Sequence, residues 1–225
     1  MSHGSDKSLL ARAFRAVAGF VVGGDWVGWV GERRVAREFT RGLFNPLRWR
    51  GDVLLNLYVP AGHGETTEVD LVYVTRWGLF VVESKNYSGA VTGDCREDEW
   101  VQCFPPSTKP YRFYNPVKQN AGHIRSLRYA LAPNGRSVPM FSVVVFGGSC
   151  SLRRISDVPA DTAVVGVGDL RETVLSFMSA NPRVLSRREV AMAYRRLDSF
   201  TFVSRREKRR HVSYVERVRA TSFRA

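Results

Sequence analysis

Asp70, Glu83 and Lys85 are the residues of this chain whose types and spacing best suit chemistry. Side chains alternate between the two faces of a β-strand, so Glu83 and Lys85 point the same way, about 7 Å apart. Two carboxylates and a lysine at the end of an apolar strand are costly to bury unless something compensates their charge. Mg²⁺ or Mn²⁺, which prefers oxygen ligands, would do so. A purely structural Glu–Lys or Asp–Lys ion pair is the alternative.

The strands that must position these groups form a hairpin. The strand of Asp70 and the strand of Glu83 and Lys85 are separated by a short turn. Directly opposed residues of an antiparallel pair share a face. A turn at residues 77–78 would oppose Asp70 to Lys85, and a turn one residue earlier would oppose it to Glu83. Both registers gather the three groups on one face, whereas a shift by one residue would scatter them.

The remaining elements are typical of an α/β domain with a mixed sheet. Apolar periodicity predicts helices over residues 26–41, 116–130, 170–178, 186–197 and 204–220. Strands are expected over residues 52–59, 67–75, 79–85, 90–93, 100–104, 139–146 and 163–166. Asp169 and Glu172 predict a cap at the start of the third helix. We expect three parts, namely an amphipathic or flexible segment 1–25, a domain 26–180 and a basic helical extension 181–225.

The charge of the chain is strongly basic, with 34 Lys and Arg against 21 Asp and Glu, a net charge of +13. Such a balance favours polyanionic partners, either nucleic acid or an anionic membrane face. Residues 181–225 hold 13 basic and 4 acidic side chains, so most of the excess lies there. The densest basic run of this segment is predicted to bind the phosphate backbone of a nucleic acid. A solvated helix face is the alternative. That run contains Arg205, Arg206, Lys208, Arg209 and Arg210.

Cysteine usage and hydropathy indicate a reduced, cytoplasmic protein without a transmembrane segment. Three loosely spaced cysteines cannot form a disulfide framework. No stretch approaches the roughly 20 apolar residues that span a bilayer. Residues 9–22 predict a short amphipathic helix that packs on the domain or contacts a membrane surface. The scattered histidines do not predict a zinc site, and His123, which can share a helical face with Gln119, is expected to be structural because it has no visible partner.

Four segments, in their order and spacing, resemble the NERD (nuclease-related domain) family, a branch of the PD-(D/E)xK nuclease superfamily. They are Gly31-Glu32-x-x-Val35, Thr67-Glu-Val-Asp70, the stretch from Gly78 to Gly89 that contains Glu83 and Lys85, and Asn115-Pro-Val-Lys-Gln119-Asn. The similar region covers about residues 28–148. The resemblance implies a restriction-endonuclease-like αβββαβ core, with a mixed central sheet, whose acids bind a divalent metal for phosphodiester hydrolysis.

The motif positions of the family carry over to this chain residue by residue. Asp70 takes the first motif acid, preceded by Val69 in place of proline, and Glu83 and Lys85 take the E-x-K positions. Glu32 takes the helical acid, which adds a metal or water contact. Gln119 takes the polar position on the following helix, facing the site. The resemblance thus implies Asp70, Glu83 and Glu32 as ligands of Mg²⁺ or Mn²⁺, with Lys85 and Gln119 completing the catalytic set.

These features together predict a metal-dependent nuclease that acts on nucleic acid, with DNA expected rather than RNA, and that can form a homo-oligomer. A second interpretation is a nucleic-acid-binding module on a nuclease-like fold, which needs no metal. A third is an adaptor that uses residues 9–22 and the basic C-terminal segment to contact a membrane surface or a protein.

Overall fold

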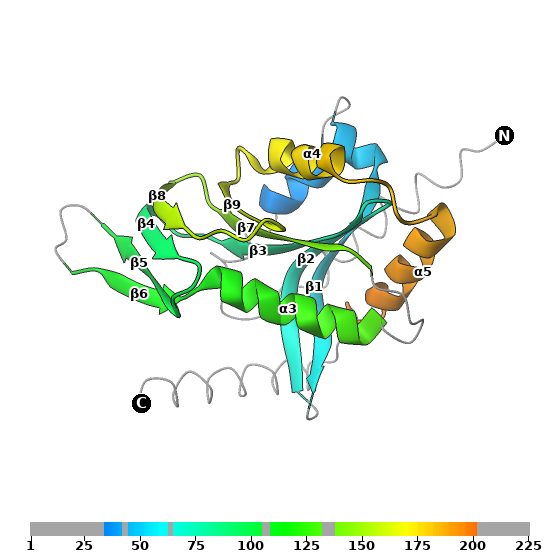
Figure 1. The fold of residues 1–225 in the computed structure, drawn as a ribbon, viewed down its shortest axis with the longest axis horizontal. Helices are drawn as coiled ribbons and strands as arrows, with labels where there is room; N and C mark the ends of the chain where they lie inside the picture. The colour runs from blue at the N-terminus through cyan, green and yellow to red at the C-terminus, as the bar shows by residue number, and fades with distance from the viewer. Residues whose placement is uncertain (1–33, 42–44, 63–64, 105–108, 132–137, 202–225) are drawn as a thin grey trace.

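A five-stranded mixed sheet forms the centre of the computed structural model, which describes residues 34–41, 45–62, 65–104, 109–131 and 138–201 (Figure 1). Its strand order is β1-β2-β3-β7-β9. The strands are β1 (Gly51–Gly62), β2 (Glu65–Thr75), β3 (Gly78–Lys85), β7 (Met140–Phe146) and β9 (Thr162–Gly166). β1, β2 and β3 are antiparallel neighbours, whereas β3, β7 and β9 run parallel. The predicted α/β class and mixed sheet are confirmed.

A smaller four-stranded sheet continues from the ends of two central strands. Its order is β6-β5-β4-β8. The strands are β4 (Gly89–Asp94), β5 (Glu99–Cys103), β6 (Tyr111–Tyr114) and β8 (Cys150–Ser156). The parallel pair of β3 and β7 passes directly into the parallel pair of β4 and β8, and the Gly147 amide donates to the Lys85 carbonyl at 2.9 Å where the sheets meet. The small sheet therefore begins where Glu83 and Lys85 lie.

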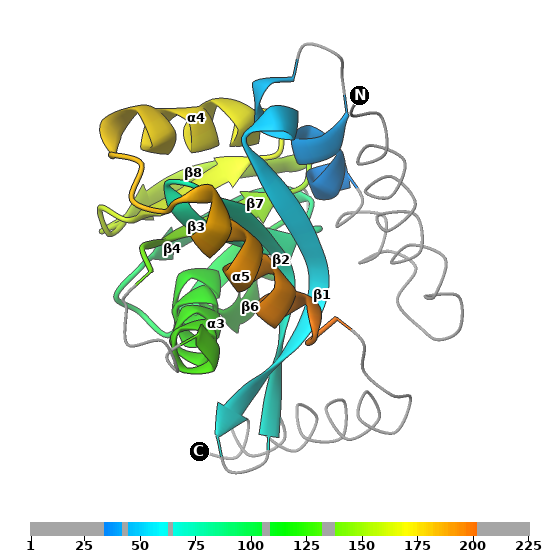
Figure 2. The ribbon, with the colours of Figure 1, turned by 90° about the vertical axis from the view of Figure 1, so that its right-hand side faces the viewer.

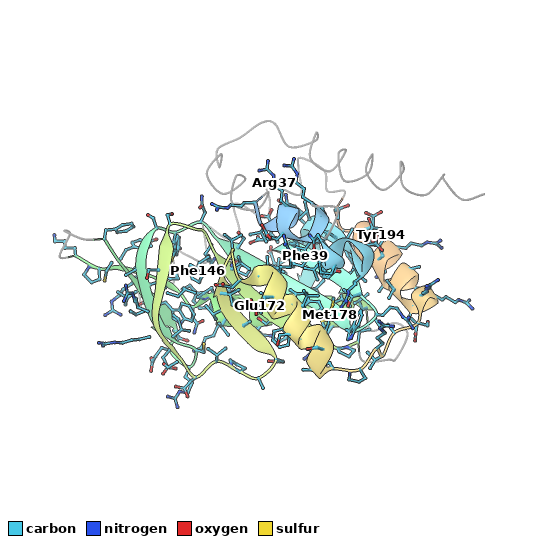
Figure 3. The ribbon with its side chains drawn as sticks, turned by 90° about the horizontal axis from the view of Figure 1, so that it is seen from above. Arg37, Phe39, Phe146, Glu172, Met178 and Tyr194 are labelled. Atoms are coloured by element: carbon cyan, nitrogen blue, oxygen red, sulfur yellow. The ribbon has the colours of Figure 1, made fainter. Side chains whose placement is uncertain are left out.

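Helices cover both faces of the central sheet. α3 (Pro116–Leu131) and α5 (Arg187–Asp198) lie on one face, next to each other against β1 and β2 (Figure 2). Helical residues 34–40 and α4 (Leu170–Ala180) lie on the other face, where Phe39 and Met178 belong to one core (Figure 3). A short 3-10 helix, η1 (Pro46–Trp49), precedes β1. This arrangement fits a restriction-endonuclease-like core.

β3 is buried on both faces, as its continuous apolar run predicts. Phe80 and Val82 enter the core beneath α4, whereas Leu79 and Val81 enter the core beneath α3 and α5. Residues 83 and 85 continue the series of Leu79 and Val81, because side chains of a strand alternate between faces. The two charged groups at the end of β3 are therefore directed toward α3.

Several element predictions need correction. β6 and β8 were not expected, because their mostly exposed side chains lack a clear apolar alternation. β1 continues through Pro60 to Gly62, which an edge strand tolerates because its outer N–H groups need no partner in the sheet. The Asp169 side chain makes no capping hydrogen bond to α4. The reciprocal cap occurs instead at α5, between Ser186 and Glu189.

Some predicted features lie outside the described residues. These are Glu32, the helix expected near residues 9–22, the first part of the helix 26–41, and the helix 204–220 with its basic run Arg205, Arg206, Lys208, Arg209 and Arg210. Within the described ranges, no helix has the length and apolar character needed to cross a membrane.

Asn115 holds the start of α3, the helix that faces the charged end of β3. Its Oδ1 accepts a hydrogen bond from the Val117 amide at 2.9 Å, and its Nδ2 donates to the Glu97 carbonyl at 2.6 Å and the Cys95 carbonyl at 3.1 Å. The side chain is fully buried. One residue therefore joins the helix N-terminus to the loop that connects β4 and β5.

We expect Asn115→Ala to lower the free energy of unfolding by about 2–4 kcal/mol. The substitution removes a helix cap, worth about 1 kcal/mol, and leaves buried backbone groups without a partner, at about 1–3 kcal/mol. Urea denaturation measures the change. Ser186→Ala, which removes the more exposed cap of α5, is the matched control and should cost about 1 kcal/mol. Equal losses for the two variants would contradict the role given to Asn115.

Candidate active site

The candidate site lies where β2 and β3 end beside the first turns of α3. Pairing of β2 with β3 runs from Thr75 opposite Gly78 to Leu71 opposite Val82. The next position beyond Leu71 and Val82 in the same register places Asp70 opposite Glu83. Of the two registers open to the sequence, the structure therefore has the one with the earlier turn. Asp70 stays at this junction because its Oδ2 accepts a hydrogen bond from the backbone amide of Ser84 at 2.7 Å.

The Glu83 carboxylate is buried, with 2% of the residue exposed, and both of its oxygens are bonded. Oε1 accepts from Lys85 Nζ at 2.7 Å, and Oε2 lies 3.1 Å from His123 Nε2. Burial alone would raise the pKa of this carboxyl. The Lys85 ammonium and the hydrogen bond to His123 outweigh that effect and hold the pKa of Glu83 below its ordinary value. Glu83 is therefore an ionised, internally paired carboxylate at neutral pH.

Lys85 connects the acids to α3. Its ammonium donates to Glu83 Oε1 and to Gln119 Oε1, the latter at 2.9 Å. Burial alone would lower the pKa of Lys85, but the negative charges of Glu83 and Asp70 outweigh it and raise the pKa above the ordinary value. A lysine ammonium has three protons, so two side-chain acceptors leave one proton for a further acceptor. Lys85 thus stays charged and keeps donor capacity.

His123 is the member of this network that the sequence did not reveal. Its Nε2 lies at Glu83 Oε2, and its Nδ1 lies 2.8 Å from Thr67 Oγ1 on β2. An ionised carboxylate can only accept, so Nε2 must carry a proton. The four-residue spacing of His123 from Gln119 indicates a shared helical face. Its partners on β2 and β3 are brought to it only when the chain folds. His123 joins three elements around Glu83.

Asn120 fixes the rotation of α3 about its axis. Its Nδ2 donates to the Val81 carbonyl and to Ser142 Oγ, each at 2.9 Å, from a fully buried position. These bonds tie the helix to β3 and β7. Because residues 119 and 123 flank this anchor on the same helix, Gln119 meets Lys85 and His123 meets Glu83.

The donor set suits a magnesium-like cation held by few protein ligands. Within the described ranges, no group of three or more His, Cys, Asp or Glu side chains is clustered to hold a metal. Asp70 and Glu83 supply carboxylates at one junction, and Mg²⁺ is commonly bound through one or two carboxylates with several waters. A cavity of about 70 Å³ adjoins Lys85 and is lined by Arg34, Ser84 and Gly147 among others.

Of the sequence-predicted site residues, the structure brings Glu83, Lys85 and Gln119 into direct contact and places Asp70 beside them. Glu32 lies outside the described residues, although Val35, three residues later, is in the core beneath α4. An αβββαβ core with an acid on its second strand and Glu-x-Lys on its third defines the restriction-endonuclease-like class.

Comparison with known proteins identifies the family within that class. Residues 27–147 match the family described as nuclease-related domain (NERD). The chain therefore belongs to the NERD family, as its motifs indicated. It is also similar to the uncharacterized protein pXO1-01 of Bacillus anthracis, with 28% identity over 190 residues that cover 84% of each chain. No solved structure matches this chain.

Proposed function

We propose that this protein is a divalent-metal-dependent nuclease that hydrolyses phosphodiester bonds of nucleic acid, with DNA as the expected substrate. The observation that carries the proposal is the convergence of Asp70, Glu83, Lys85 and Gln119 at one point of the fold. Membership of the NERD family supports a nuclease-related fold. The charges at this point fit a reaction at a phosphate group, in which negative charge develops on oxygen.

Each side chain of the site has a role in this proposal. Asp70 and Glu83, together with Glu32, would hold the cation, which when bound activates water and neutralises phosphate charge. Lys85 directs its remaining proton toward a phosphate oxygen and stabilises charge there. Gln119 holds Lys85 in place through its side-chain oxygen. His123 holds one oxygen of Glu83 and so positions the carboxylate between the helix and the sheet.

A metal-free nucleic-acid-binding module is the second candidate function. The observation that favours it is that Lys85 and His123 already satisfy the Glu83 carboxylate. A pocket whose buried charges are paired internally does not need a cation to be stable. The two candidates differ in what they predict for metal binding, which can be measured without any assay of cleavage.

We expect Mn²⁺ to raise the melting temperature of the full chain by about 5–10 °C. A ligand that binds only the folded state, at 100 times its dissociation constant, stabilises it by about 2.7 kcal/mol. For a chain of this size, 1 kcal/mol corresponds to about 2–4 °C. Asp70→Asn, which removes one charge and keeps the shape, should abolish most of the shift.

Asp161→Asn, at an exposed position near the far edge of the sheet, is the matched control and should keep the wild-type shift. The same proteins are then incubated with plasmid and single-stranded DNA, with Mn²⁺ or with EDTA. Metal-dependent cleavage by the wild type and the control, but not by Asp70→Asn, supports the nuclease. Equal melting shifts for Asp70→Asn and Asp161→Asn would contradict Asp70 as a metal ligand, and DNA binding without a metal effect would support the binding module.

A further inference from the structure

A set of arginines covers the outer surface of the two helices on the α3 side of the sheet. We call this surface the α3–α5 basic face and define it by five exposed side chains, namely Arg125, Arg128, Arg187, Arg188 and Arg195. α3 contains no acidic residue, and α5 contains only Glu189 and Asp198. Glu189 is engaged in the cap of α5. The net charge of this face is therefore strongly positive.

These arginines are not used to hold the protein together. In the described part of the chain, none of the five guanidinium groups has a carboxylate within ion-pairing distance, whereas Lys118 is paired with Asp98 and Arg171 with Glu38. Unpaired charges of one sign repel one another and lower the stability of the folded state. A polyanion would relieve that repulsion.

The relative position of the two helices is fixed, so their arginines form one surface. Arg196 donates from Nε to the Ala130 carbonyl at 3.2 Å, which joins α5 to the last turn of α3. The Arg196 guanidinium also lies 5.3 Å from the ring centre of Phe200. Figure 2 shows α3 and α5 next to each other over the same face of the sheet. Arg196, which is itself exposed, thus links the two helices, and the basic face consists of the other five arginines.

The basic face includes the outer side of α3, the same helix that carries Gln119 at the candidate site. Lys118 precedes Gln119, the residue that holds Lys85, and Arg125 lies two helical turns from Lys118 on the same line of α3. Arg128 is about 14 Å along the axis from Gln119 and projects from the opposite, outer side of the helix. By contrast, the open groove between β9 and α4 is lined by acids, including Asp161, Asp169 and Glu172. The negative charge of a nucleic-acid backbone therefore favours the outer surface of α3 and α5 over the groove between β9 and α4.

We propose that the α3–α5 basic face binds the sugar–phosphate backbone of the nucleic acid that reaches Lys85. This inference rests on the proposed function, because that function supplies the polyanion at the site. A membrane surface fits the face less well. Its large exposed apolar side chains are Tyr129 and Met192, at 73% and 47%, and an interfacial helix needs a continuous apolar face.

The test compares two triple variants that lose the same charge from the full chain. R125Q/R128Q/R195Q removes arginines of the basic face, and R112Q/R153Q/R154Q removes exposed arginines of the small sheet. Anisotropy of labelled single-stranded and duplex DNA is measured in EDTA over a range of salt concentrations. We expect the first variant to bind at least about tenfold more weakly and to lose about 2–3 from its log–log salt slope, since each phosphate contact contributes about 0.7–0.9. The control should bind like the wild type.

The outcomes separate this inference from the proposed function, because binding is measured without metal. Equal binding by the two triple variants would overturn the inference and leave the nuclease proposal standing. A wild type that binds through this face but never cleaves would overturn only the nuclease proposal. Loss of binding to anionic phosphatidylserine vesicles, with DNA binding unchanged, would assign the face to a membrane and also overturn the inference. Melting temperatures near the wild-type value confirm folding, as expected for exposed substitutions.

Discussion

Lys85→Met is expected to reduce metal-dependent cleavage by about 10²–10³-fold, the cost of removing one preorganised donor that stabilises developing charge. Lys85 is charged, held by Glu83 and Gln119, and has a proton left for a phosphate oxygen. Methionine keeps an unbranched apolar side chain that ends where the lysine ammonium begins, so the charged group is lost. The measurement is the initial rate of plasmid cleavage in Mn²⁺ at saturating DNA, well below the melting temperature of each protein.

The control for this experiment is Lys109→Met, an exposed lysine in the described residues near β6. It loses the same charge at a distance from the acids, so its cleavage rate should stay within about twofold of the wild type. If Lys85→Met kept a comparable rate, Lys85 would have only a structural role in its ion pair. Gln119→Leu gives an intermediate test, since it removes one of the two acceptors of Lys85 and keeps the ammonium.

Glu83→Gln is expected to lower the free energy of unfolding by about 3–5 kcal/mol at neutral pH, the usual cost of breaking a buried ion pair from one side. The substitution leaves the Lys85 ammonium without its nearest counter-charge in a mostly buried position. It also replaces an acceptor of the His123 hydrogen bond. Urea denaturation measures the loss, and Glu172→Gln on the exposed face of α4 is the control, with an expected change below about 0.5 kcal/mol.

The direction of the pKa shifts sets the pH range of this effect. The pKa of Glu83 is below its ordinary value near 4.5, so its stabilising contribution is present above that value and is lost as the pH falls through the folded-state pKa. The pKa of Lys85 is raised above 10.5, so its contribution is present below that value and lost at higher pH. The difference in the free energy of unfolding between the wild type and Glu83→Gln should therefore become smaller under acid conditions. If that difference in the free energy of unfolding stayed constant down to low pH, Glu83 would not be ionised in the folded protein at neutral pH.

A double variant tests whether the loss comes from the lone charge. Glu83→Gln combined with Lys85→Met removes both members of the pair and leaves no uncompensated ammonium. It should be more stable than Glu83→Gln alone, because replacing both partners of a buried pair is far less costly than removing one. If the loss in the free energy of unfolding of the double variant equalled the sum of the losses of the two single variants, the two side chains would not act as a pair.

Strand alternation and apolar runs predict the central elements of this fold well. The strands that contain Asp70 and Glu83 and the helix that contains Gln119 form nearly where their patterns indicate. Two kinds of prediction fail, each for its own physical reason. β6 and β8 are mostly exposed and are stabilised by their neighbours in the small sheet, so their own residues carry little signal. Glu172 does not complete a cap at Asp169, because capping depends on a local backbone geometry that residue types alone do not specify.

Residue types and their spacing specify which groups are available for chemistry and on which elements they lie. The acids, the lysine and the glutamine occur at strand and helix spacings, and such local periodicity follows directly from residue types. Three features come from the folded chain: the register that opposes Asp70 to Glu83, the bonds of His123 to Thr67 and Glu83, and the placement of α5 beside α3. These depend on contacts between segments far apart in the chain, which form when cores pack and buried polar groups find partners. For the same reason, the basic face on α3 and α5 appears only after folding.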